Sequence, residues 1–394
     1  MKTKLWTTGT TDSLDFDVEK YTVGNDSTVD KKLIGYDIMA TIAHSEMLVD
    51  LKILTTKEQK LIKKSLNDLS LLTGKDDFTL EGFEDCHSYI EAYLIEHAGE
   101  SGKKIHTARS RNDQSLTMMR LYIKESIKKH VEQTHALKQK LNFIAEKYSD
   151  IAMPGYTHMQ KAMPTTVCVW LSAYYDALQD SVCALDATLS SIDQNPLGSG
   201  AGFGSSFNID REITTKSLGF AKTQENPMYC GLSRGYFELM CLQSMNLSMV
   251  IIGKLMSDLL LFTTQEFCFF SLPEKYTTGS SIMPHKHNYD VLEIARGKCH
   301  IFWSHQQKVQ SIYGSIGSGY QRDLQLTKEI FVEAFEEAEQ TIEIVTKIIG
   351  ELEVHKDCLE KSITPEMQSV THVNELVKTG ENFRDAYKII KKRL

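Results

Sequence analysis

The sequence has few of the residues that interrupt helices. It contains seven prolines among 394 residues, and proline is the residue that most strongly breaks a helix. Long segments therefore run without any proline. The sequence also has no useful run with the alternating pattern of a strand, no internal repeat and no low-complexity segment. These absences argue against a β-rich or repeat architecture and leave long helices as the expected elements.

Several kinds of site are missing from the sequence as well. The eight cysteines form no C-x-x-C pair, which is typical of reduced cytosolic thiols rather than of a disulfide framework or a zinc site. His285 and His287 flank Lys286, a spacing that does not suit two ligands on one helix face. Neither G-x-G-x-x-G after a strand nor G-x-x-x-x-G-K-[ST] occurs, so no nucleotide site is indicated. We expect neither a metal nor a cofactor.

The sequence also lacks a strong bulk charge and a targeting signal. A net charge of −8 with 24% charged residues gives no general attraction for nucleic acid or anionic membranes. The start, MKTKLWTTGTTDSLDFD, has no apolar core of a secretion signal. The most apolar window, about residues 249–270, is interrupted by Lys254, Asp258 and Glu266, so we interpret it as a buried helix. We expect a cytoplasmic protein without nucleic-acid or membrane partners.

The sequence is rich in apolar residues at helical spacing. Residues 115–150 carry them close to every 3.6 positions, at Met119, Ile123, Ile127, Val131, Leu137, Leu141 and Ile144. The same reasoning predicts helices over about 165–192, 234–271, 290–312 and 323–350. Several exceed 25 residues and must pack lengthwise in a bundle or between subunits. The helix after residue 234 is apolar nearly all round, which favours an oligomeric bundle.

Polar residues gather at the breaks between these helices, in four clusters. The first, KKIHTARSRNDQ (103–114), immediately precedes the first long helix. Arg109 and Arg111 beside hydroxyls at a helix start fit a carboxylate-binding site. A helix start capped by Asn112 or Asp113, with solvated arginines, explains the same segment equally well.

The other three clusters also have ordinary explanations. MPGYTHMQKAMP (153–164) predicts a proline-bounded loop with Thr157 and His158, and a lone loop histidine is more often exposed than catalytic. GSSIMPHKHN (279–288) fits a flexible surface loop. GSIGSGYQRDLQLTKE (314–329) fits a glycine turn followed by a helix start. Four such clusters at the ends of long helices nevertheless favour a functional site, because bundles build sites there.

Three of these strings resemble a known family. HTARSRNDQ, GYTHMQKAMP and GSSIMPHKHN, in that order, are similar to segments of the fumarase/aspartase superfamily and, within it, of the argininosuccinate lyases. The first string is close to specific for that branch, whereas the third is specific only to the superfamily. The resemblance covers nearly the whole chain. It implies reversible cleavage of argininosuccinate into arginine and fumarate, a step of arginine biosynthesis.

The resemblance also implies an architecture. We expect an all-α fold in which a long central helix bundle is shared between the subunits of a homotetramer, with each active site built from three subunits. The expected domains are an N-terminal, mostly helical domain (1–105), the central bundle (106–350) and a short C-terminal helical domain (351–394). Relatives normally continue through more of that last domain.

The resemblance assigns roles to individual residues. Ser280 matches the base that removes a proton from the carbon next to a substrate carboxylate, and Lys286 matches the cation that stabilises the resulting aci-carboxylate. His158, paired with Glu293, matches the pair that helps to move protons. The expected substrate contacts are Ser27, Arg111, Asn112, Thr157, Asn288, Tyr320, Gln325 and Lys328.

The sequence departs from the family pattern at a few positions. His285 and His287 lie in the Gly-Ser-Ser loop, and Tyr289 stands where a second proline is usual. Ser233 precedes Arg234 where the family commonly has Asp-Arg, which removes an expected partner of the arginine. Three other readings stay open: another fumarate-releasing lyase of the superfamily, a catalytically inactive homologue, and a helical scaffold without a ligand.

Overall fold

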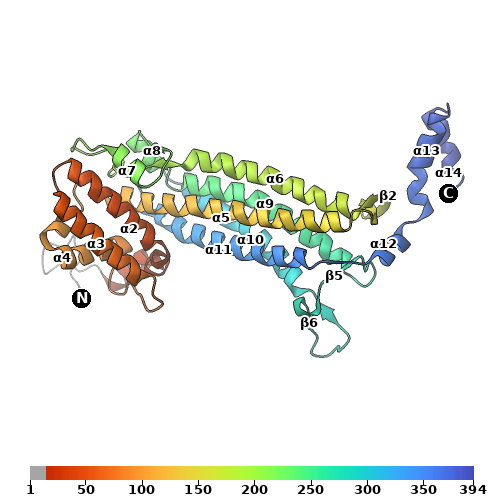
Figure 1. Ribbon diagram of the computed structural model, residues 1–394, viewed down its shortest axis with the longest axis horizontal. Coiled ribbons are helices and arrows are strands. Elements are labelled where there is room, and N and C mark those ends of the chain that lie inside the picture. Colours follow the sequence, from red (N-terminus) through yellow and green to blue (C-terminus); the bar gives the residue numbers. More distant parts are fainter. Residues whose placement is uncertain (1–14) are drawn as a thin grey trace. The chain divides into compact units, whose positions relative to one another are not determined.

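A computed structural model describes residues 15–394 (Figure 1), so the expectation about the first residues lies largely outside the described range. The chain forms two compact units. Among the described residues, unit 1 comprises 15–129, 184–245 and 303–336, and unit 2 comprises 130–183, 246–302 and 337–394. The three-domain division expected from the sequence stays a prediction.

Helices predominate in both units, which confirms the all-α prediction, and five of these helices are long. They are α5 (Arg111–Lys147), α6 (Val167–Ile192), α9 (Tyr236–Phe262), α10 (Asp290–Gly314) and α11 (Leu326–Gly350). Each contributes one segment to each unit, and within a unit these segments lie side by side (Figure 1). Their apolar faces are buried against one another, as the 3.6-residue pattern requires.

The helix α9 is shorter than the sequence pattern suggested. It ends at Phe262 rather than near residue 271. The hydroxyls of Thr263 and Thr264 donate to carbonyls of the last helical turn, and Phe269 N donates to Phe262 O, which folds the chain back. Threonine hydroxyls satisfy backbone groups in this way at helix ends. The apolar residues after Phe262 are therefore core residues of a turn, not of a helix.

Length and composition alone would allow α9 to cross a membrane. Half of its most apolar window is buried inside the protein, and core helices of soluble proteins pass the same test. The helix does not indicate a membrane protein.

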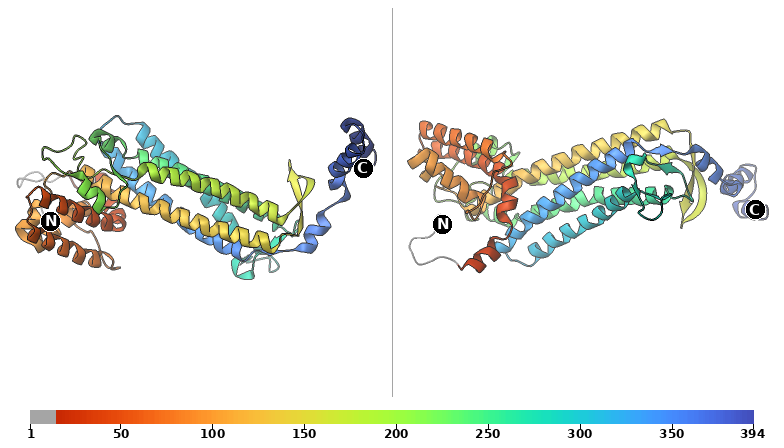
Figure 2. Two further views of the ribbon diagram at one scale, coloured as in Figure 1. Left: turned by 45° about the horizontal axis from the view of Figure 1, so that its top comes forward. Right: turned by 90° about the horizontal axis from the view of Figure 1, so that it is seen from below.

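Shorter helices complete unit 1. They are α1 (Phe16–Val23), α2 (Asp26–Asp50), α3 (Thr56–Thr73), α4 (Cys86–Ala98), α7 (Arg211–Ser217) and α8 (Pro227–Leu232), with 3-10 turns at Gly99–Lys104 and Arg322–Gln325. The short strands β3 (Gln194–Asn195) and β4 (Lys222–Thr223) pair in parallel. The helix α3 starts with a capping box, in which Thr55 and Glu58 bond each other's backbone N–H. Figure 2 shows α2, α3 and α4 packed together.

Unit 2 adds short strand pairs and the C-terminal helices. β1 (Ala152–Thr157) pairs with β2 (Gln160–Thr166), β5 (Phe270–Ser271) with β8 (Glu353–Val354), and β6 (Thr278–Gly279) with β7 (His287–Asn288), all antiparallel. The remaining helices are α12 (Lys356–Ser362), α13 (Ser369–Lys378) and α14 (Phe383–Lys391), with 3-10 turns at Glu274–Tyr276 and Pro365–Gln368.

The predicted proline-bounded loop at 153–164 is wrong, because this segment forms most of the hairpin β1–β2 (Figure 2). Pro154 lies opposite Pro164, and a bulge follows at Gly155, where an added Cβ would lie 2.7 Å from Met163 O. Proline is compatible with edge strands and bulges. The two prolines and the missing alternation hid the hairpin in the sequence.

An aromatic cluster anchors this hairpin in unit 2. The Tyr156 ring centroid lies 6.2 Å from that of Phe262 and 5.7 Å from that of Phe267. The Trp170 ring stacks on Phe270 with centroids 5.0 Å apart. The indole N–H of Trp170 and the hydroxyl of Tyr174 both donate to one carboxylate oxygen of Asp258, at 2.9 and 2.6 Å. One carboxylate therefore joins α6 to α9.

Replacing Asp258 by alanine should destabilise the protein, because both donors lose a charged acceptor. Such bonds contribute about 1.5–3 kcal/mol each at most, so we expect a loss of about 2 kcal/mol in the free energy of unfolding. Urea unfolding at one fixed protein concentration measures it. Asp180→Ala, which removes an exposed carboxylate of the partner helix α6, should change this free energy by about 0.5 kcal/mol or less. Equal effects of the two variants would contradict this account.

Candidate active site

The residues expected to form the site fall into two groups. Unit 1 holds six of them: Ser27, Arg111, Asn112, Tyr320, Gln325 and Lys328. Unit 2 holds the other six: Thr157, His158, Ser280, Lys286, Asn288 and Glu293. All of them lie at or near the ends of helices or in the short hairpins, as the polar clusters suggested.

The N-terminus of α5 is held by hydrogen bonds of residues that neighbour the expected ligand contacts Arg111 and Asn112. Ser110 Oγ accepts from Asn112 N at 3.2 Å, and Asp113 Oδ1 accepts from Ser110 N at 2.9 Å. Ser110 is therefore the N-cap, and Asp113 closes the same turn by accepting from the Ser110 N–H. The alternative reading, a start capped by Asn112 or Asp113, placed the N-cap two or three residues too late. Asn112 is half-buried and its side chain is not used as a cap. This leaves its amide for a ligand.

Asp113 also fixes a glycine-rich loop against the helix start. Its Oδ2 accepts from Gly198 N at 2.9 Å and from Gly200 N at 3.0 Å. Burial raises the pKa of Asp113 to about 6, although the backbone donors and Arg109 act in the opposite direction. The loop PLGSG is thus tied to the turn that carries Arg111.

The two arginines of the first cluster have different environments. Arg109 is buried and donates to Thr41 Oγ1 at 3.0 Å, so it is not solvated. Arg111 is half-buried and donates to Asp85 Oδ2 at 3.2 Å and to Ser88 Oγ at 2.8 Å. These contacts hold a cation at a helix start, where free N–H groups also favour anions. Of the two, Arg111 is the one available to a carboxylate.

Lys328 is buried between two carboxylates of α2. Its Nζ lies 2.5 Å from Asp30 Oδ1 and 3.0 Å from Asp26 Oδ1. Burial lowers the pKa of Lys328, but Asp30 and Asp26 outweigh burial and raise it. Lys328 is therefore a fixed cation beside Ser27, which lies in the first turn of α2. Gln325 donates to Thr22 O at 3.3 Å.

The histidine His158 occupies the tip of the hairpin β1–β2. Thr157 pairs with Gln160, so His158 and Met159 form the two-residue turn. Both have positive φ, at 54° and 60°, which is the geometry of a type I′ turn and is usually supplied by Asn-Gly. The turn presents the His158 imidazole to solvent. Such strain is often stored at functional sites.

A second small hairpin carries Ser280 and Lys286. Gly279 pairs with His287 and forms the last pair of this hairpin before its connecting loop. Ser280 is therefore the first residue of that loop and Lys286 the last. Ser280 Oγ accepts from Met283 N at 3.1 Å and, less closely, from Ile282 N at 3.4 Å. Lys286 is exposed and Ser280 is half-buried. The hydroxyl oxygen thus faces backbone N–H donors in a loop that also holds a free cation.

The two ends of this loop are held together. Thr278 Oγ1 donates to Asp290 Oδ2 at 2.5 Å, and Leu272 N donates to the Tyr289 hydroxyl at 3.4 Å. Tyr289, which replaces the usual proline, therefore makes a contact at the exit of the loop.

His158 and Glu293 are both exposed in this single chain. Within residues 15–394 neither takes part in an ion pair with the other. Their expected pairing stays a prediction that needs another subunit.

Sequence reasoning missed a buried network behind Arg111. His87 Nδ1 lies 2.7 Å from Asp37 Oδ2, and Gln114 Nε2 donates to Asp37 Oδ1 at 2.9 Å. The Cys86 thiol lies close to both, and Asp37, Cys86 and His87 could together hold a metal ion by distance. Asp37 raises the pKa of His87 against the effect of burial. The string EDCHS was the only local signal of this network.

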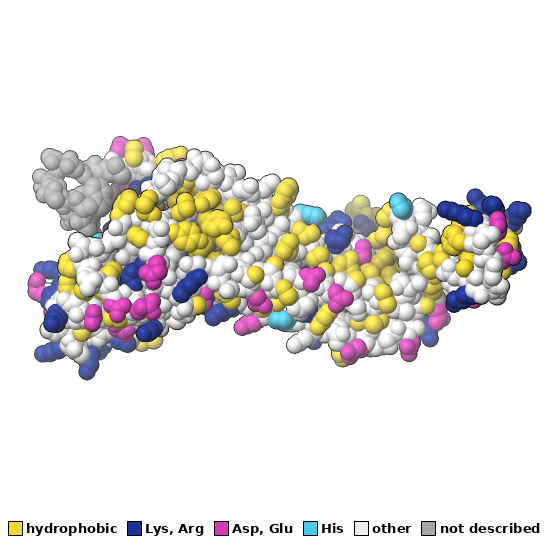
Figure 3. All heavy atoms as spheres, turned by 90° about the horizontal axis from the view of Figure 1, so that it is seen from above, with side chains coloured by type: hydrophobic (Ala, Val, Ile, Leu, Met, Phe, Trp, Pro, Cys, Tyr) yellow, Lys and Arg dark blue, Asp and Glu magenta, His cyan; other side chains and the backbone are white. Residues whose placement is uncertain are grey.

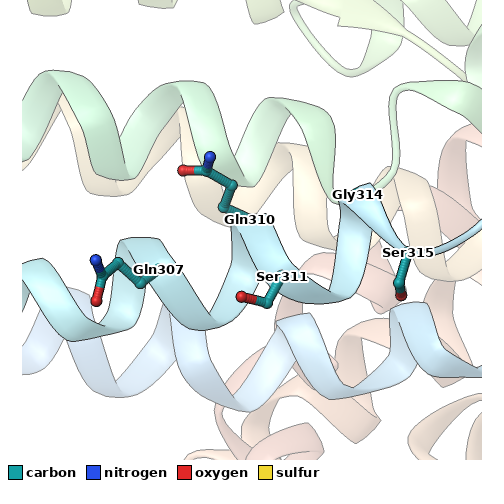
Figure 4. A pocket seen from close by; sticks show the side chains of 5 residues that line it. All are labelled: Gln307, Gln310, Ser311, Gly314 and Ser315. Carbon is teal, nitrogen blue, oxygen red and sulfur yellow. The ribbon is translucent and has the colours of Figure 1, made fainter.

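A polar concavity of about 660 Å³ lies at the end of α10, and none of its lining residues is an expected site residue. It is lined by Gln307, Gln310, Ser311, Gly314 and Ser315 (Figure 4). None of these side chains carries a charge. The concavity is therefore a poor match for a ligand with several carboxylates.

Comparisons with known proteins agree with the resemblance of the motifs. A protein-family model described as a lyase matches residues 17–301. The argininosuccinate lyase of Thermotoga neapolitana is 43% identical over 391 residues, which cover 99% of this chain and 98% of that protein. The argininosuccinate lyase of Bacteroides fragilis is 39% identical over 389 residues, which cover 98% of this chain and 87% of that protein.

Solved structures share the fold. An EDDS lyase with bound fumarate matches with a TM-score of 0.80 at 21% identity, over 97% of this chain and 76% of that one. A class II fumarase from Schistosoma mansoni matches with a TM-score of 0.78 at 18% identity, over 95% and 91%. At such identities the likeness shows the fold alone. Together with the full-length sequence matches, it means that the chain belongs to the argininosuccinate lyase family of the fumarase/aspartase superfamily.

Proposed function

We propose that the protein is an argininosuccinate lyase in which Ser280 is the catalytic base. The observation that carries the mechanism is the hydrogen bonding of Ser280 Oγ, which accepts from Met283 N and Ile282 N. The full-length relationship to argininosuccinate lyases supports the choice of substrate. The reaction yields arginine and fumarate and belongs to arginine biosynthesis.

The first step removes a proton from the carbon next to a succinyl carboxylate. A neutral serine hydroxyl is too weak a base for this, so its surroundings must favour the oxyanion. Backbone N–H groups that donate to the oxygen stabilise the charged form. Met283 N and Ile282 N supply such donors, so the loop itself lowers the cost of deprotonating Ser280.

Loss of that proton places a second negative charge on the neighbouring carboxylate. Lys286 immediately precedes β7 and lies in the same loop as Ser280, to which it supplies an ammonium group. A fixed cation at a developing negative charge lowers the barrier in the manner of an oxyanion site. Asn288, at the end of β7, supplies an amide for the same carboxylate. Closure of the loop over the substrate would exclude water from this pair.

The second step breaks the carbon–nitrogen bond and forms the double bond of fumarate. The departing guanidino nitrogen takes up a proton as it leaves. His158, with Glu293 supplied by another subunit, is the pair that we assign to proton transfer, because a carboxylate partner raises the basicity of an imidazole. Thr157 lies beside it in the hairpin.

The unit 1 residues suit the rest of the substrate. Argininosuccinate has three carboxylates and a guanidinium, so its site needs cations interleaved with neutral donors and acceptors. Arg111 and Lys328 are cations held by carboxylates of their own unit. Their neutral neighbours are Ser27, Asn112, Tyr320 and Gln325. We assign these six residues to substrate binding.

We further propose a cytoplasmic homotetramer with active sites shared between subunits. On α9, Leu247 and Val250 are about half exposed. They continue a stripe that starts at Tyr236 and Met240, with successive spacings of four, seven and three residues that keep all four on one helix face. Such a stripe is the seam by which helices of different chains pack. Figure 3 shows further hydrophobic side chains gathered on one face of unit 1.

Turnover tests the proposed function. The wild-type protein should release fumarate from argininosuccinate, and the ultraviolet absorbance of fumarate measures this release. Ser280→Ala should lower kcat by about a thousandfold or more, because the base is lost. Ser281→Ala is the matched control, since it removes the neighbouring exposed hydroxyl and should keep kcat within about threefold.

Two results would contradict the proposal. Release of fumarate from adenylosuccinate or aspartate but not from argininosuccinate would favour another lyase of the superfamily. Equal kcat for Ser280→Ala and wild type would remove Ser280 from the role of base.

Assembly can be tested on the stripe of α9. Leu247→Asp combined with Val250→Asp should convert the oligomer into single chains, because charges would be buried in the seam, and turnover should fall with assembly. Size-exclusion chromatography with light scattering measures the mass. Leu71→Asp, at an exposed leucine of α3, is the control and should leave the mass unchanged. An unchanged mass for the double variant would disprove the seam.

A further inference from the structure

Arg234 lies where three segments of unit 1 meet. It follows α8 and precedes Gly235, which has a φ of 81° and leads into α9. A Cβ at Gly235 would lie 3.0 Å from Leu324 Cδ2 and 3.1 Å from Tyr313 Cδ2. The backbone at this point is therefore pressed against the segment 313–324, which includes Tyr320.

The guanidinium of Arg234 contacts two elements that carry expected substrate contacts. Its Cζ lies 4.6 Å from the centroid of the Tyr320 ring, within the range of a cation–π interaction. Its Nη2 donates to Ser115 Oγ at 3.4 Å. Ser115 lies on α5 three residues after Asn112 and four after Arg111, so it shares their helix face. Arg234 thus links Tyr320 to the helix start.

Tyr320 depends on this contact for its position. It follows Gly319, whose φ is 88°, in a segment that also contains Gly317. Within the described residues its hydroxyl makes no hydrogen bond, and its ring is 37% exposed. A tyrosine in a glycine-rich segment has many accessible orientations, and the buried guanidinium selects one of them.

A buried carboxylate acts electrostatically on Arg234. It belongs to Glu238, in the first turn of α9, which interacts with the charges of both Arg234 and Arg120 and accepts from Gly235 N at 2.8 Å. Burial raises the pKa of Glu238, and the two arginines act against this rise. The residue before Arg234 serves the other arginine, because Ser233 Oγ accepts from Arg120 Nη2 at 2.9 Å. Glu238 therefore supplies a negative charge that acts on Arg234, where Ser233 supplies none.

We propose that Arg234 is a positioning residue for substrate binding, which fixes the Tyr320 ring against the start of α5. The inference rests on the proposed function, because it deepens the role of Tyr320. Arg234 acts through Tyr320 rather than on the reacting atoms. Its loss should weaken the binding of argininosuccinate and leave the chemical step unchanged.

The test is a double-mutant cycle between Arg234 and Tyr320. Arg234→Lys keeps the charge beside Glu238 but removes the planar group that stacks on the ring. We expect KM for argininosuccinate to rise about tenfold, with kcat within about twofold of wild type. In a Tyr320→Leu background, which has no ring to position, the same substitution should change KM less than about twofold.

Arg120→Lys is the matched control. Arg120 is also buried, lies near Glu238 and stacks on an aromatic ring, that of Phe237 at 4.1 Å, but it touches none of the expected substrate contacts. This variant should lower the thermal midpoint without changing KM. Ser115→Ala removes only the hydrogen bond that Arg234 donates to Ser115, so it can replace Arg234→Lys if that variant does not fold. It should raise KM about twofold to threefold.

Equal effects of Arg234→Lys on KM in both backgrounds would overturn the inference, as would a loss of thermal stability alone. Wild-type turnover is recorded first. If wild type does not release fumarate, the proposed function fails separately, and the same cycle is measured with the Kd of argininosuccinate by calorimetry. Absence of any binding would overturn both.

Discussion

The length of the helices is the constraint on which the rest of this structure depends. A helix of 25 residues or more is stabilised mainly by packing its apolar face along its length, so it has little room for polar chemistry in its interior. The helices α5, α9, α10 and α11 follow this rule, and the groups assigned to binding and catalysis lie at or just beyond their ends. Arg111 starts α5, Glu293 lies in the first turn of α10, and Lys328 lies in the first turn of α11. The protein therefore separates the tasks of packing and chemistry along each helix.

Charges at these ends are held by other charges, and this decides which of them a ligand can use. Lys328 is enclosed by Asp30 and Asp26, whereas Arg111 is only half-buried and shares Asp85 with the start of α4. A buried ion pair contributes little net stability once desolvation is counted, but it fixes the position of a cation. The cations of unit 1 are thus set in place before any substrate arrives, which reduces the ordering cost of binding. In unit 2 the charged groups are not fixed in advance, since Lys286 and His158 are exposed. They become enclosed only when substrate or another subunit covers them.

The sequence was informative where structure depends on local periodicity. The five long helices followed from apolar spacing, with errors only near their ends, because side-chain hydrogen bonds of Thr263 and Thr264 set the end of α9 and no periodicity encodes them. The sequence analysis did not predict the hairpin around His158, because its prolines and its bulge interrupt the alternating pattern by which a strand is recognised. The alternative reading of the segment before α5 assigned the wrong N-cap and placed both arginines in solvent, although Arg109 is buried. The network of Asp37, His87 and Gln114 joins three segments far apart in the sequence, and only tertiary contact reveals it.

The pair Ser233–Arg234 illustrates why a departure from a family pattern must be read in its surroundings. By sequence alone, the loss of an aspartate next to Arg234 leaves a cation without a partner, and a buried cation without a partner is strongly unfavourable. In the structure the buried carboxylate of Glu238, four residues after Arg234, interacts electrostatically with both Arg234 and Arg120, while Ser233 accepts a hydrogen bond from Arg120. Two arginines, one glutamate and one serine thus share a single network. The charge balance of the site depends on the whole network. The absence of an aspartate at position 233 therefore does not mean that Arg234 is left without an opposite charge.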